Sequence, residues 1–539
     1  MPTLEQANIL AKSGKLKEAE RCFIQILENG HKEASLIRYF LASIQVQLGN
    51  IKNAIDNLNL IKHYFTHDSN FKNTFGVALL RSGDLNSAKL CFEESIKIKE
   101  DNFQAILNLA TTYLKLDQPI KSEQLFKRAL SINSKDPNLY LNYSQTLKAM
   151  DKNDEAEEIA RKALELLPKN TDLNINLAAI MTQAGDYEGA ERHYREAIKN
   201  NISAELQHNL SMILLQSGNL IEGWKRYEWR WKTPDYQLAH KFFNRPMWNG
   251  KRINNGSLLI WTEQGIGDQI LYSSMINDLR GLASEIILAC EDRLVRIFSK
   301  SFNFLKVISL SALHDDEKIL SQISFQIPIA SLGQFFRQSY KSFSGEPFLI
   351  YDIKARNKIR RKYNNLYGNK PIIGLSWKSS NPRYGKKKSL TVQEFVKPLL
   401  GIDAVFISLQ YGDILEDIET FKKYGVIINQ DESVDNLNDL EMFSIQVSAM
   451  DLVISVSNTT AHFAGAIGVR CWTMISSGQG QFWYWFRDRS DSPWYSSLRL
   501  FRQSQIGKWD KVLIDITKEF KNTKDLSFIL KQNYGKENE

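Results

Sequence analysis

Two short stretches decide the fold of the first half of the chain: Ile106-Leu-Asn-Leu-Ala-Thr-Thr-Tyr113 and Leu125-Phe-Lys-Arg-Ala-Leu130. Apolar residues recur in both at the three- and four-residue spacing of an amphipathic helix. Asp117 lies between them as a turn residue. The segment therefore predicts two helices joined by a tight turn.

The same pattern recurs along the first half of the chain with a period of 33 to 35 residues. The turn residues are Gly14, Gly49, Gly83, Asp117, Asp151, Gly185 and Gly218. Five positions after each turn lies a small residue, namely Ala19, Ala54, Ala88, Ser122, Ala156, Ala190 or Gly223. Nine positions after each turn lies Phe23, Leu58, Phe92, Phe126, Ala160, Tyr194 or Tyr227. Small residues let two helices approach closely, and the larger ones fill the space beside them. Residues 1–231 thus resemble the tetratricopeptide repeat, which predicts an α-solenoid of about seven repeats over 1–232.

Stacked helical hairpins form a superhelix with a concave groove, which favours a protein or peptide partner. The alternative is that the repeats only stack or dimerise. One polar position recurs on the first helix of successive repeats: Asn73, Asn108, Asn142, Asn176 and Asn209. Such a ladder could bond an extended backbone, or it could simply face solvent.

The charge of the 539-residue chain is concentrated in one segment. The net charge is +8, but residues 351–390 hold 12 Lys and Arg with one acid, Asp352, so the remainder is about −3. A single short block without a known motif does not predict a nucleic-acid-binding protein. All 11 tryptophans lie at Trp224 or later, so two differently built halves meet near residue 230.

Targeting signals and cysteines bound the location. No run approaches 18 uncharged apolar residues, so no transmembrane segment is expected, although peripheral membrane contact stays open. The first residues lack a secretory pattern. The four cysteines are scattered, which fits a reducing, cytoplasmic compartment and no disulfide scaffold or metal site.

The second half alternates short apolar runs with helical stretches. The runs are Leu258–Trp261, Ile286–Ala289, Val307–Leu310, Phe325–Ile329, Ile372–Trp377, Val405–Leu409, Val426–Ile428, Leu452–Val456 and Cys471–Ile475. Buried parallel strands have this character, so the sequence predicts two facing, doubly wound Rossmann-like α/β domains. The predicted segments are a connector (233–256), a first half (257–353), a basic linker (354–370), a second half (371–520) and a polar tail (521–539).

The first of these strands is followed by Glu263-Gln-Gly-Ile-Gly-Asp268 and then a helical run. Gly265 and Gly267 allow a ligand to approach the backbone. Asp268 could accept a proton from an attacking hydroxyl, or it could cap the helix. Spacing alone favours the cap, because caps are common at helix starts.

The strand Leu452–Val456 leads into Ser457-Asn-Thr-Thr-Ala-His462 at the start of a helix. Free N–H groups and the helix dipole favour a diphosphate there, and the hydroxyls of Ser457, Thr459 and Thr460 add donors. His462 could donate to a phosphate or a leaving group. The alternative is a capped helix with a histidine satisfied in the core.

Three further stretches could face the same cleft. Lys386, Lys387 and Lys388 follow another strand end and complement a diphosphate, unless they form a solvated basic loop. Gln410 could bond a base or a ribose. The run Phe482-Trp-Tyr-Trp-Phe486 could line a pocket or form an apolar core patch.

Several of these motifs together resemble a known family. Residues 245–520 are similar to bacterial glycosyltransferase-like proteins that follow tetratricopeptide repeats. The stretches that carry the resemblance are Trp224, Tyr227-Glu-Trp-Arg-Trp231, Pro246-Met-Trp-Asn-Gly250, Glu263-Gln-Gly-Ile-Gly-Asp268, Ser408-Leu-Gln410, Asn458-Thr-Thr-Ala-His-Phe-Ala-Gly465, Asp491-Ser-Pro-Trp-Tyr495 and Arg499-Leu-Phe-Arg-Gln503. The fold it implies is that of the ADP-heptose lipopolysaccharide heptosyltransferases, the GT-B arrangement of two facing α/β domains.

The resemblance also implies roles. It makes Asp268 the catalytic base and Lys388 a contact to donor phosphate. It assigns the turn from Ser457 to His462 to the nucleotide-sugar. The histidine is kept, whereas the family's Asp, Thr and Gly are replaced by Ser457, Asn458 and Thr459. In outline the chain also resembles the O-linked N-acetylglucosamine transferases, whose repeats recruit protein substrate.

The sequence therefore predicts a glycosyltransferase that moves a sugar from a nucleotide-diphosphate-sugar to a hydroxyl acceptor, a protein or surface glycan recruited by the repeats. The catalytic residues would be Asp268 and His462. The donor would contact Gly265, Gly267, Lys388, Gln410, Ser457, Asn458, Thr459 and Thr460. No Asp-x-Asp follows a strand, so no metal or further cofactor is expected. The alternative is a repeat adaptor whose second half only binds nucleotide-sugar or scaffolds partners.

Overall fold

The computed structural model describes residues 2–234, 236, 245–313, 317–382 and 384–522. The chain forms two compact units, Met1–Met181 and Thr182–Glu539. The predicted polar tail lies outside the described residues from 523 onward, and so does the middle of the predicted connector, residues 237–244.

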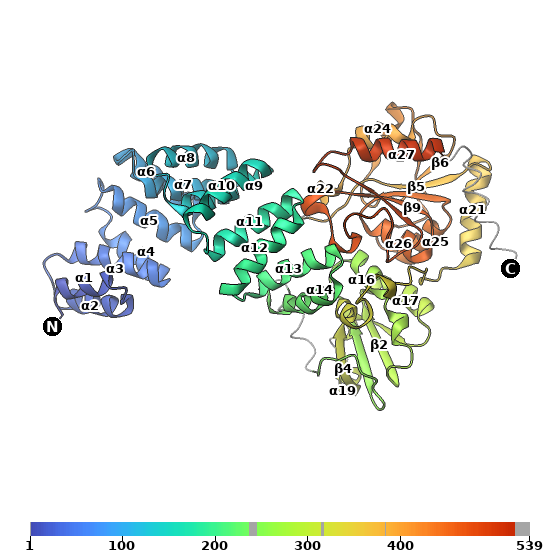
Figure 1. Ribbon diagram of the computed structural model, residues 1–539, viewed down its shortest axis with the longest axis horizontal. Helices are drawn as coiled ribbons and strands as arrows, with labels where there is room; N and C mark the ends of the chain where they lie inside the picture. The colour runs from blue at the N-terminus through green and yellow to red at the C-terminus, as the bar shows by residue number, and fades with distance from the viewer. Residues whose placement is uncertain (1, 235, 237–244, 314–316, 383, 523–539) are drawn as a thin grey trace. The chain divides into compact units, whose positions relative to one another are not determined.

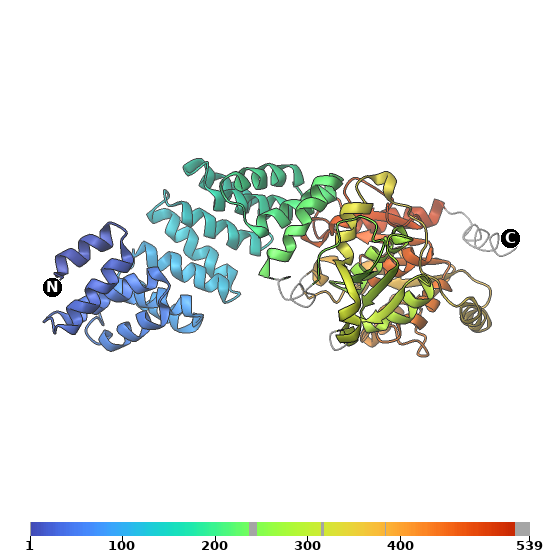
Figure 2. The ribbon, with the colours of Figure 1, turned by 90° about the horizontal axis from the view of Figure 1, so that it is seen from below.

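The first unit consists of antiparallel helical hairpins (Figures 1 and 2). Its helices are α1 (Leu4–Lys12), α2 (Leu16–Glu28), α3 (Ala34–Leu48), α4 (Ile51–Ile61), α5 (Ser69–Ser82), α6 (Leu85–Ile98), α7 (Phe103–Lys115), α8 (Pro119–Ile132), α9 (Pro137–Ala149), α10 (Asn153–Leu166) and α11 (Thr171–Ala184), the last of which runs into the second unit. The second unit continues the series with α12 (Tyr187–Asn200), α13 (Ala204–Ser217), α14 (Leu220–Tyr227) and the short helix η1 (Glu228–Lys232).

The turn residues of the repeat pattern adopt the backbone conformation that ends a helix. Each of the seven has a positive φ, from 57° at Asp117 and Asp151 to 91° at Gly83. Glycine reaches this left-handed region without steric cost, and aspartate tolerates it better than most residues. The small residues after the turns are buried, and a Cβ on Gly223 would meet Leu215 at 2.8 Å. The predicted hairpins are thus confirmed within residues 4–227.

The rest of the second unit contains two all-parallel sheets. The first has the order β3-β2-β1-β4 and the second has the order β10-β9-β8-β5-β6-β7. The strands are β1 (Ser257–Trp261), β2 (Glu285–Cys290), β3 (Lys306–Ser309), β4 (Ile323–Pro328), β5 (Ile372–Ser376), β6 (Val405–Ser408), β7 (Ile428–Asn429), β8 (Leu452–Val456), β9 (Cys471–Ile475) and β10 (Leu498–Arg502). The sequence missed β10, where the exposed Arg499 and the half-buried Arg502 interrupt the apolar run.

Helices connect these strands. The longer ones are α16 (Ile266–Ser273), α17 (Val295–Ser301), α21 (Ile353–Tyr367), α24 (Leu415–Lys423), α25 (Leu440–Ser448), α26 (Thr459–Ile467) and α27 (Asp510–Asn522). The shorter ones are η2 (Ile276–Leu279), η3 (Asp292–Leu294), α18 (Leu310–Leu313), α19 (Glu317–Gln322), η4 (Ile329–Leu332), α20 (Gly333–Phe336), η5 (Tyr340–Ser342), α22 (Gly385–Lys388), α23 (Val392–Phe395), η6 (Lys397–Leu399), η7 (Gly478–Gly480) and η8 (Trp483–Trp485). Most of the segment predicted as a basic linker is helix α21, which packs on α25.

Both sheets are buried on both faces. Along β1, Leu258 and Ile260 join one core, whereas Leu259 and Trp261 join another on the opposite face. Successive side chains of a strand point to opposite faces, so this pattern shows that helices or loops cover each side. The largest core also takes in Trp224 from α14. The last repeat and the two sheets therefore share one hydrophobic core.

Candidate active site

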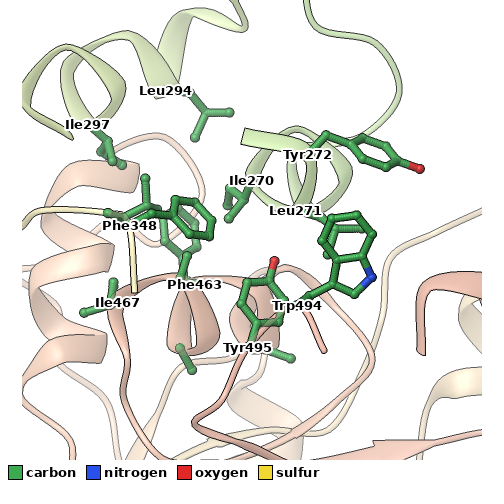
Figure 3. Close-up of a cluster of buried hydrophobic side chains, with 14 of the residues drawn as sticks. Ile270, Leu271, Tyr272, Leu294, Ile297, Phe348, Phe463, Ile467, Trp494 and Tyr495 are labelled. Carbon is green, nitrogen blue, oxygen red and sulfur yellow. The ribbon is translucent and has the colours of Figure 1, made fainter. Parts of the chain in front are cut away.

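Helices α16 and α26 face each other between the two sheets (Figure 1). Apolar side chains of α16 and α17 pack there against α26 and the segment around Trp494 (Figure 3). The labelled residues of this cluster are Ile270, Leu271, Tyr272, Leu294, Ile297, Phe348, Phe463, Ile467, Trp494 and Tyr495. This apolar contact holds the N-terminal ends of α16 and α26 at one place, although they are nearly 200 residues apart in sequence.

A cavity of about 290 Å³ lies at these helix ends. Eight of the predicted site residues line it: Gly265, Gly267, Asp268, Lys388, Ser457, Asn458, Thr459 and His462. They follow the carboxyl ends of β1, β5 and β8, where ligands bind in parallel α/β sheets. The structure thus brings residues of both halves to one cavity, as the predicted pair of facing domains with a shared cleft requires.

Asp268 both caps helix α16 and faces the cavity. Its Oδ2 accepts a hydrogen bond from the Gly265 N–H at 3.2 Å, as in a capping interaction. Burial raises the pKa of the Asp268 carboxyl to about 6, while the Gly265 N–H and the Lys388 ammonium act in the opposite direction. The two roles that the sequence left open are therefore compatible, because one oxygen can cap while the other meets a ligand.

The start of α26 is fixed by Asn458. Its Oδ1 accepts the Thr460 N–H at 3.0 Å, while its Nδ2 donates to Ser376 Oγ at 2.8 Å and to the Lys378 carbonyl at 3.0 Å. These bonds tie the loop after β8 to the loop after β5. The positive end of the α26 dipole consequently lies at the cavity, which favours an anion there.

His462 is an uncharged side chain at neutral pH. Burial, with Lys388 nearby, lowers the pKa of its imidazole to about 3. Its Nδ1 lies 3.0 Å from Tyr495 Oη, and its ring stacks on Trp485. A Cβ on Gly267 would meet His462 at 2.8 Å, so only glycine permits this approach of the two halves. His462 can therefore donate or accept a hydrogen bond in the cavity, but it does not carry a charge.

Lys388 supplies positive charge beside the start of α26. Its Nζ donates to the Ser457 carbonyl at 2.8 Å and lies 4.4 Å from the centre of the Phe482 ring. Burial lowers the pKa of the Lys388 ammonium to about 8, and Asp268 partly offsets this. The group is therefore still largely protonated at pH 7. Lys386 and Lys387 are not in the lining, so the prediction that three lysines share the cleft is wrong for these two.

Gln410 and Thr460 do not line the cavity either. The Oε1 of Gln410 already accepts from Trp377 N–H and Lys378 N–H at 3.0 and 2.8 Å, and its Nε2 donates to the Tyr411 carbonyl. Gln410 thus fixes the strand ends rather than presenting an amide to a ligand. Thr460 is a residue of the first turn of α26, and its side chain is buried. The aromatic run divides, because Phe482 and Tyr484 line the cavity whereas Trp483, Trp485 and Phe486 are core.

Sequence reasoning missed nine further residues of the cavity lining. They are Arg293, Ser379, Ser380, Asn381, Tyr411, Asn436, Leu437, Leu440 and Phe443. Arg293 follows β2, and its Nη1 donates to the Leu437 carbonyl of the other half at 2.7 Å. The available signal was position, since each polar member lies just after a strand.

The asparagine ladder of the repeats is partly engaged in bonds of its own. Asn108 Nδ2 donates to Asn73 Oδ1 at 2.9 Å, and Asn176 Nδ2 donates to Ser144 Oγ at 2.7 Å. These bonds join successive repeats within the first unit. Asn176 is buried, so it is not a solvent-facing position.

Two features are absent from the residues that the structure describes. Within the described ranges, no group of three or more His, Cys, Asp or Glu side chains is arranged to hold a metal ion. In the same ranges, no helix is both long enough and apolar enough to cross a bilayer.

Comparison with known proteins supports the repeats. Tetratricopeptide repeat families match residues 4–62, 71–102, 103–136 and 147–207, so this part of the chain consists of tetratricopeptide repeats. Protein FlbA of Caulobacter vibrioides is 28% identical over 349 residues, which cover 61% of this chain and 58% of that protein. The chain thus spans little more than half the length of this relative.

Two of the matching solved structures are described as tetratricopeptide repeat proteins. A tetratricopeptide repeat protein from Parabacteroides merdae is 15% identical, with a TM-score of 0.38, over 44% of this chain and 94% of its own. TTC0263 from Thermus thermophilus is 19% identical, with a TM-score of 0.29, over 32% of this chain and 95% of its own.

Proposed function

We propose that the chain is a glycosyltransferase of GT-B architecture that transfers a sugar from a nucleotide-diphosphate-sugar to a hydroxyl acceptor. One observation carries the proposal. A single cavity between two parallel α/β sheets joins an acid from one half, Asp268, to a lysine, a neutral histidine and a helix N-terminus from the other. Glycosyl transfer needs a base and a site for a departing anion, and this cavity offers both.

The donor diphosphate fits the wall formed by the start of α26. The helix dipole and Lys388 oppose its negative charge, and Arg293 adds a second cation to the lining. Charge on the diphosphate increases as its bond to the sugar breaks. Groups that are already in place stabilise this transition state without reorganisation.

Asp268 then acts as the base. An acceptor hydroxyl attacks the anomeric carbon and forms the new C–O bond, while the bond from that carbon to the diphosphate oxygen breaks. The hydroxyl proton passes to Asp268, whose pKa of about 6 leaves it mostly ionised at pH 7 and still basic enough to take part. His462 contributes as a hydrogen-bond partner, because an imidazole with a pKa of about 3 is not an acid at this pH.

The repeats would recruit the acceptor. Tetratricopeptide repeats indicate protein–protein interaction. The proposed acceptor is therefore a protein, or a surface glycan presented by one, and nucleic acid is not expected.

One observation favours the adaptor alternative. Ser457 Oγ accepts a hydrogen bond from Trp485 Nε1 at 2.7 Å, and the Asn458 amide is bonded to neighbouring loops. Both side chains are thus used to hold the fold, where the resembling transferases have an acid and a threonine. A protein that binds nucleotide-sugar without turnover could have this arrangement.

A nucleotide-release assay with a panel of nucleotide-sugars separates the two functions. We expect release with one class of donor, loss of release of at least about 100-fold in Asp268→Asn, and no effect of chelators. Asp413→Asn is the matched control, since it changes an exposed acid outside the cavity. Calorimetric binding of a donor without any release would establish the adaptor, and release undiminished in Asp268→Asn would remove Asp268 from the mechanism.

A further inference from the structure

The loop between β1 and α16 is fastened to the last repeat by a buried ion pair. Arg230, in η1, has no solvent exposure, and its Nη2 lies 2.8 Å from Glu263 Oε1. Its Nε also donates to the other oxygen of Glu263 at 3.2 Å. Two parallel bonds between a guanidinium and a carboxylate fix the orientation as well as the distance. The backbone at Glu263 therefore cannot move independently of the last repeat.

A second bond fastens the next residue of the loop. Gln264 Nε2 donates to Tyr227 Oη at 2.9 Å. Gln264 has a φ of 66°, in the left-handed region that non-glycine side chains seldom adopt. Such a conformation persists only when its surroundings impose it. The bond to Tyr227 is one such constraint, and the Arg230–Glu263 pair is the other.

The same loop carries the candidate base. Gly265 follows Gln264 and donates its N–H to Asp268 Oδ2, and the Gln264 carbonyl accepts from Gln269 Nε2. A short series of bonds thus runs from α14 and η1 through three consecutive loop residues to the Asp268 carboxylate. Tyr227 is the ninth residue after the turn of the seventh repeat. In the other repeats this position fills the core of a helical hairpin, whereas in the seventh it also binds the loop that leads to the cavity.

We propose that Tyr227 and Arg230 are positioning residues, which hold the loop from Thr262 to Gly267 so that Asp268 meets the acceptor hydroxyl. The orientation of Asp268 toward an acceptor rests on the proposed function, whereas the restraint of the loop does not. On this proposal the last repeat is part of the catalytic apparatus rather than a spacer that carries it.

Hydrogen exchange of the full chain tests the mechanical part without any substrate. In Tyr227→Phe, the amides of residues 262–269 should exchange about fivefold faster, which corresponds to the loss of one hydrogen bond. Peptides from β1 and α26 should be unchanged. Tyr194→Phe is the matched control, because Tyr194 is a buried tyrosine at the same repeat position one repeat earlier. Equal exchange of residues 262–269 in the two variants would overturn the proposal.

Gln264→Asn tests the bond from its other end. Asparagine tolerates a positive φ but is too short to reach Tyr227, so the backbone is spared while the bond is lost. Faster exchange of the loop in this variant is expected even if Tyr227→Phe folds poorly. Unchanged exchange in a folded Gln264→Asn would contradict the role of Tyr227.

The pH dependence tests the catalytic part. A looser loop admits water to Asp268, so its raised pKa should fall toward its ordinary value and the acid limb of nucleotide release should move to lower pH in Tyr227→Phe. Donor affinity should stay the same, since Lys388, Arg293 and the start of α26 do not belong to the loop that the substitution loosens. A change in rate with an unmoved acid limb would show a role in stability alone. If the wild type releases no nucleotide from any donor, the proposed function fails, and the exchange experiment alone decides the positioning role.

Discussion

The third and the seventh repeats follow the same 34-residue pattern but bury different side chains. In the third, Ala88 and Phe92 pack within the repeat unit alone. In the seventh, Trp224 donates to the Arg337 carbonyl of the neighbouring α/β half at 2.9 Å and packs edge-on against Trp483 of the other half. The pattern thus determines that a hairpin forms, whereas the side chains that depart from it determine what the hairpin packs against.

The largest expected effect comes from deleting the two kinds of repeat separately. A chain that begins at Asn170 should keep the rate of nucleotide release from the donor, measured with a small acceptor, within about twofold, because residues from 182 onward form a compact unit of their own. A chain that begins at Thr233 should fail to fold, since Trp224 and Tyr227 belong to the core of that unit. Thermal melting and the release assay measure both outcomes. An active chain lacking all repeats would show that the α/β half does not need the seventh repeat to fold.

Alanine in place of one buried aromatic residue of each of these repeats gives the next largest effect. Phe92→Ala and Trp224→Ala should each cost about 4 kcal/mol of the free energy of unfolding. Phe92→Ala should lower only the transition of the first unit, as followed by calorimetry, and leave nucleotide release unchanged. Trp224→Ala should lower the transition of the α/β unit and reduce release with it. A single transition shifted equally by both variants would show that the repeats do not differ.

The pH dependence should belong to the cavity and not to the repeats. Release should rise through about pH 6 as Asp268 loses its proton and fall above about pH 8 as Lys388 loses its own, giving a bell-shaped profile. Lys388→Gln should remove the alkaline limb and weaken donor binding about tenfold. The affinity of residues 1–181 for a protein partner should not follow this pH profile. A partner affinity that rises near pH 6 and falls near pH 8 would show that the repeats and the cavity are not independent.

Burial of the Asp268 carboxylate also has a cost for stability. Its folded-state pKa is raised, so stability falls as the pH rises from the unfolded value near 4 through about 6, the window in which the carboxyl ionises. Asp268→Asn should therefore raise the melting temperature of the α/β unit at pH 7.5 while abolishing release. No gain in melting temperature would mean that the carboxylate is better solvated than its surroundings indicate.

The smallest effect concerns the asparagine ladder. Asn108→Ala removes one bond between successive repeats, the bond to Asn73, and should cost the first unit about 1 kcal/mol. The rate of nucleotide release, measured with a small acceptor, should not change. Calorimetry measures the first effect, and a fall in release would link the first unit to the cavity.

The sequence predicted most elements of the fold because their signals are local. Turn residues such as Gly83 are marked by their spacing, and buried strands such as Leu452–Val456 are continuous apolar runs. The strand Leu498–Arg502 was missed because its arginines hide the apolar pattern. Most of the segment predicted as a linker, 354–370, is helical. The sequence did not reveal this helix because a run of basic residues masks its buried residues, Ile359 and Tyr363.

The candidate site was harder to predict because it depends on contacts between distant segments. Asp268 and His462 could be marked as polar residues at strand ends, and a common cleft for them followed only from the prediction of two facing domains. Gln410 looked equally suitable, yet the backbone N–H groups of Trp377 and Lys378 already occupy it. Arg230 gave no sign of its role, since its partner Glu263 lies 33 residues away. Spacing reveals which residues lie near a strand end, but not which of them are already bonded.

The most direct test is a structure of the full chain with a bound nucleoside diphosphate. We expect the diphosphate in the cavity, within hydrogen-bond distance of Lys388 Nζ and the first N–H groups of α26, with Asp268 facing it. A nucleoside diphosphate bound elsewhere on the chain, with this cavity empty, would rule out the proposed donor site.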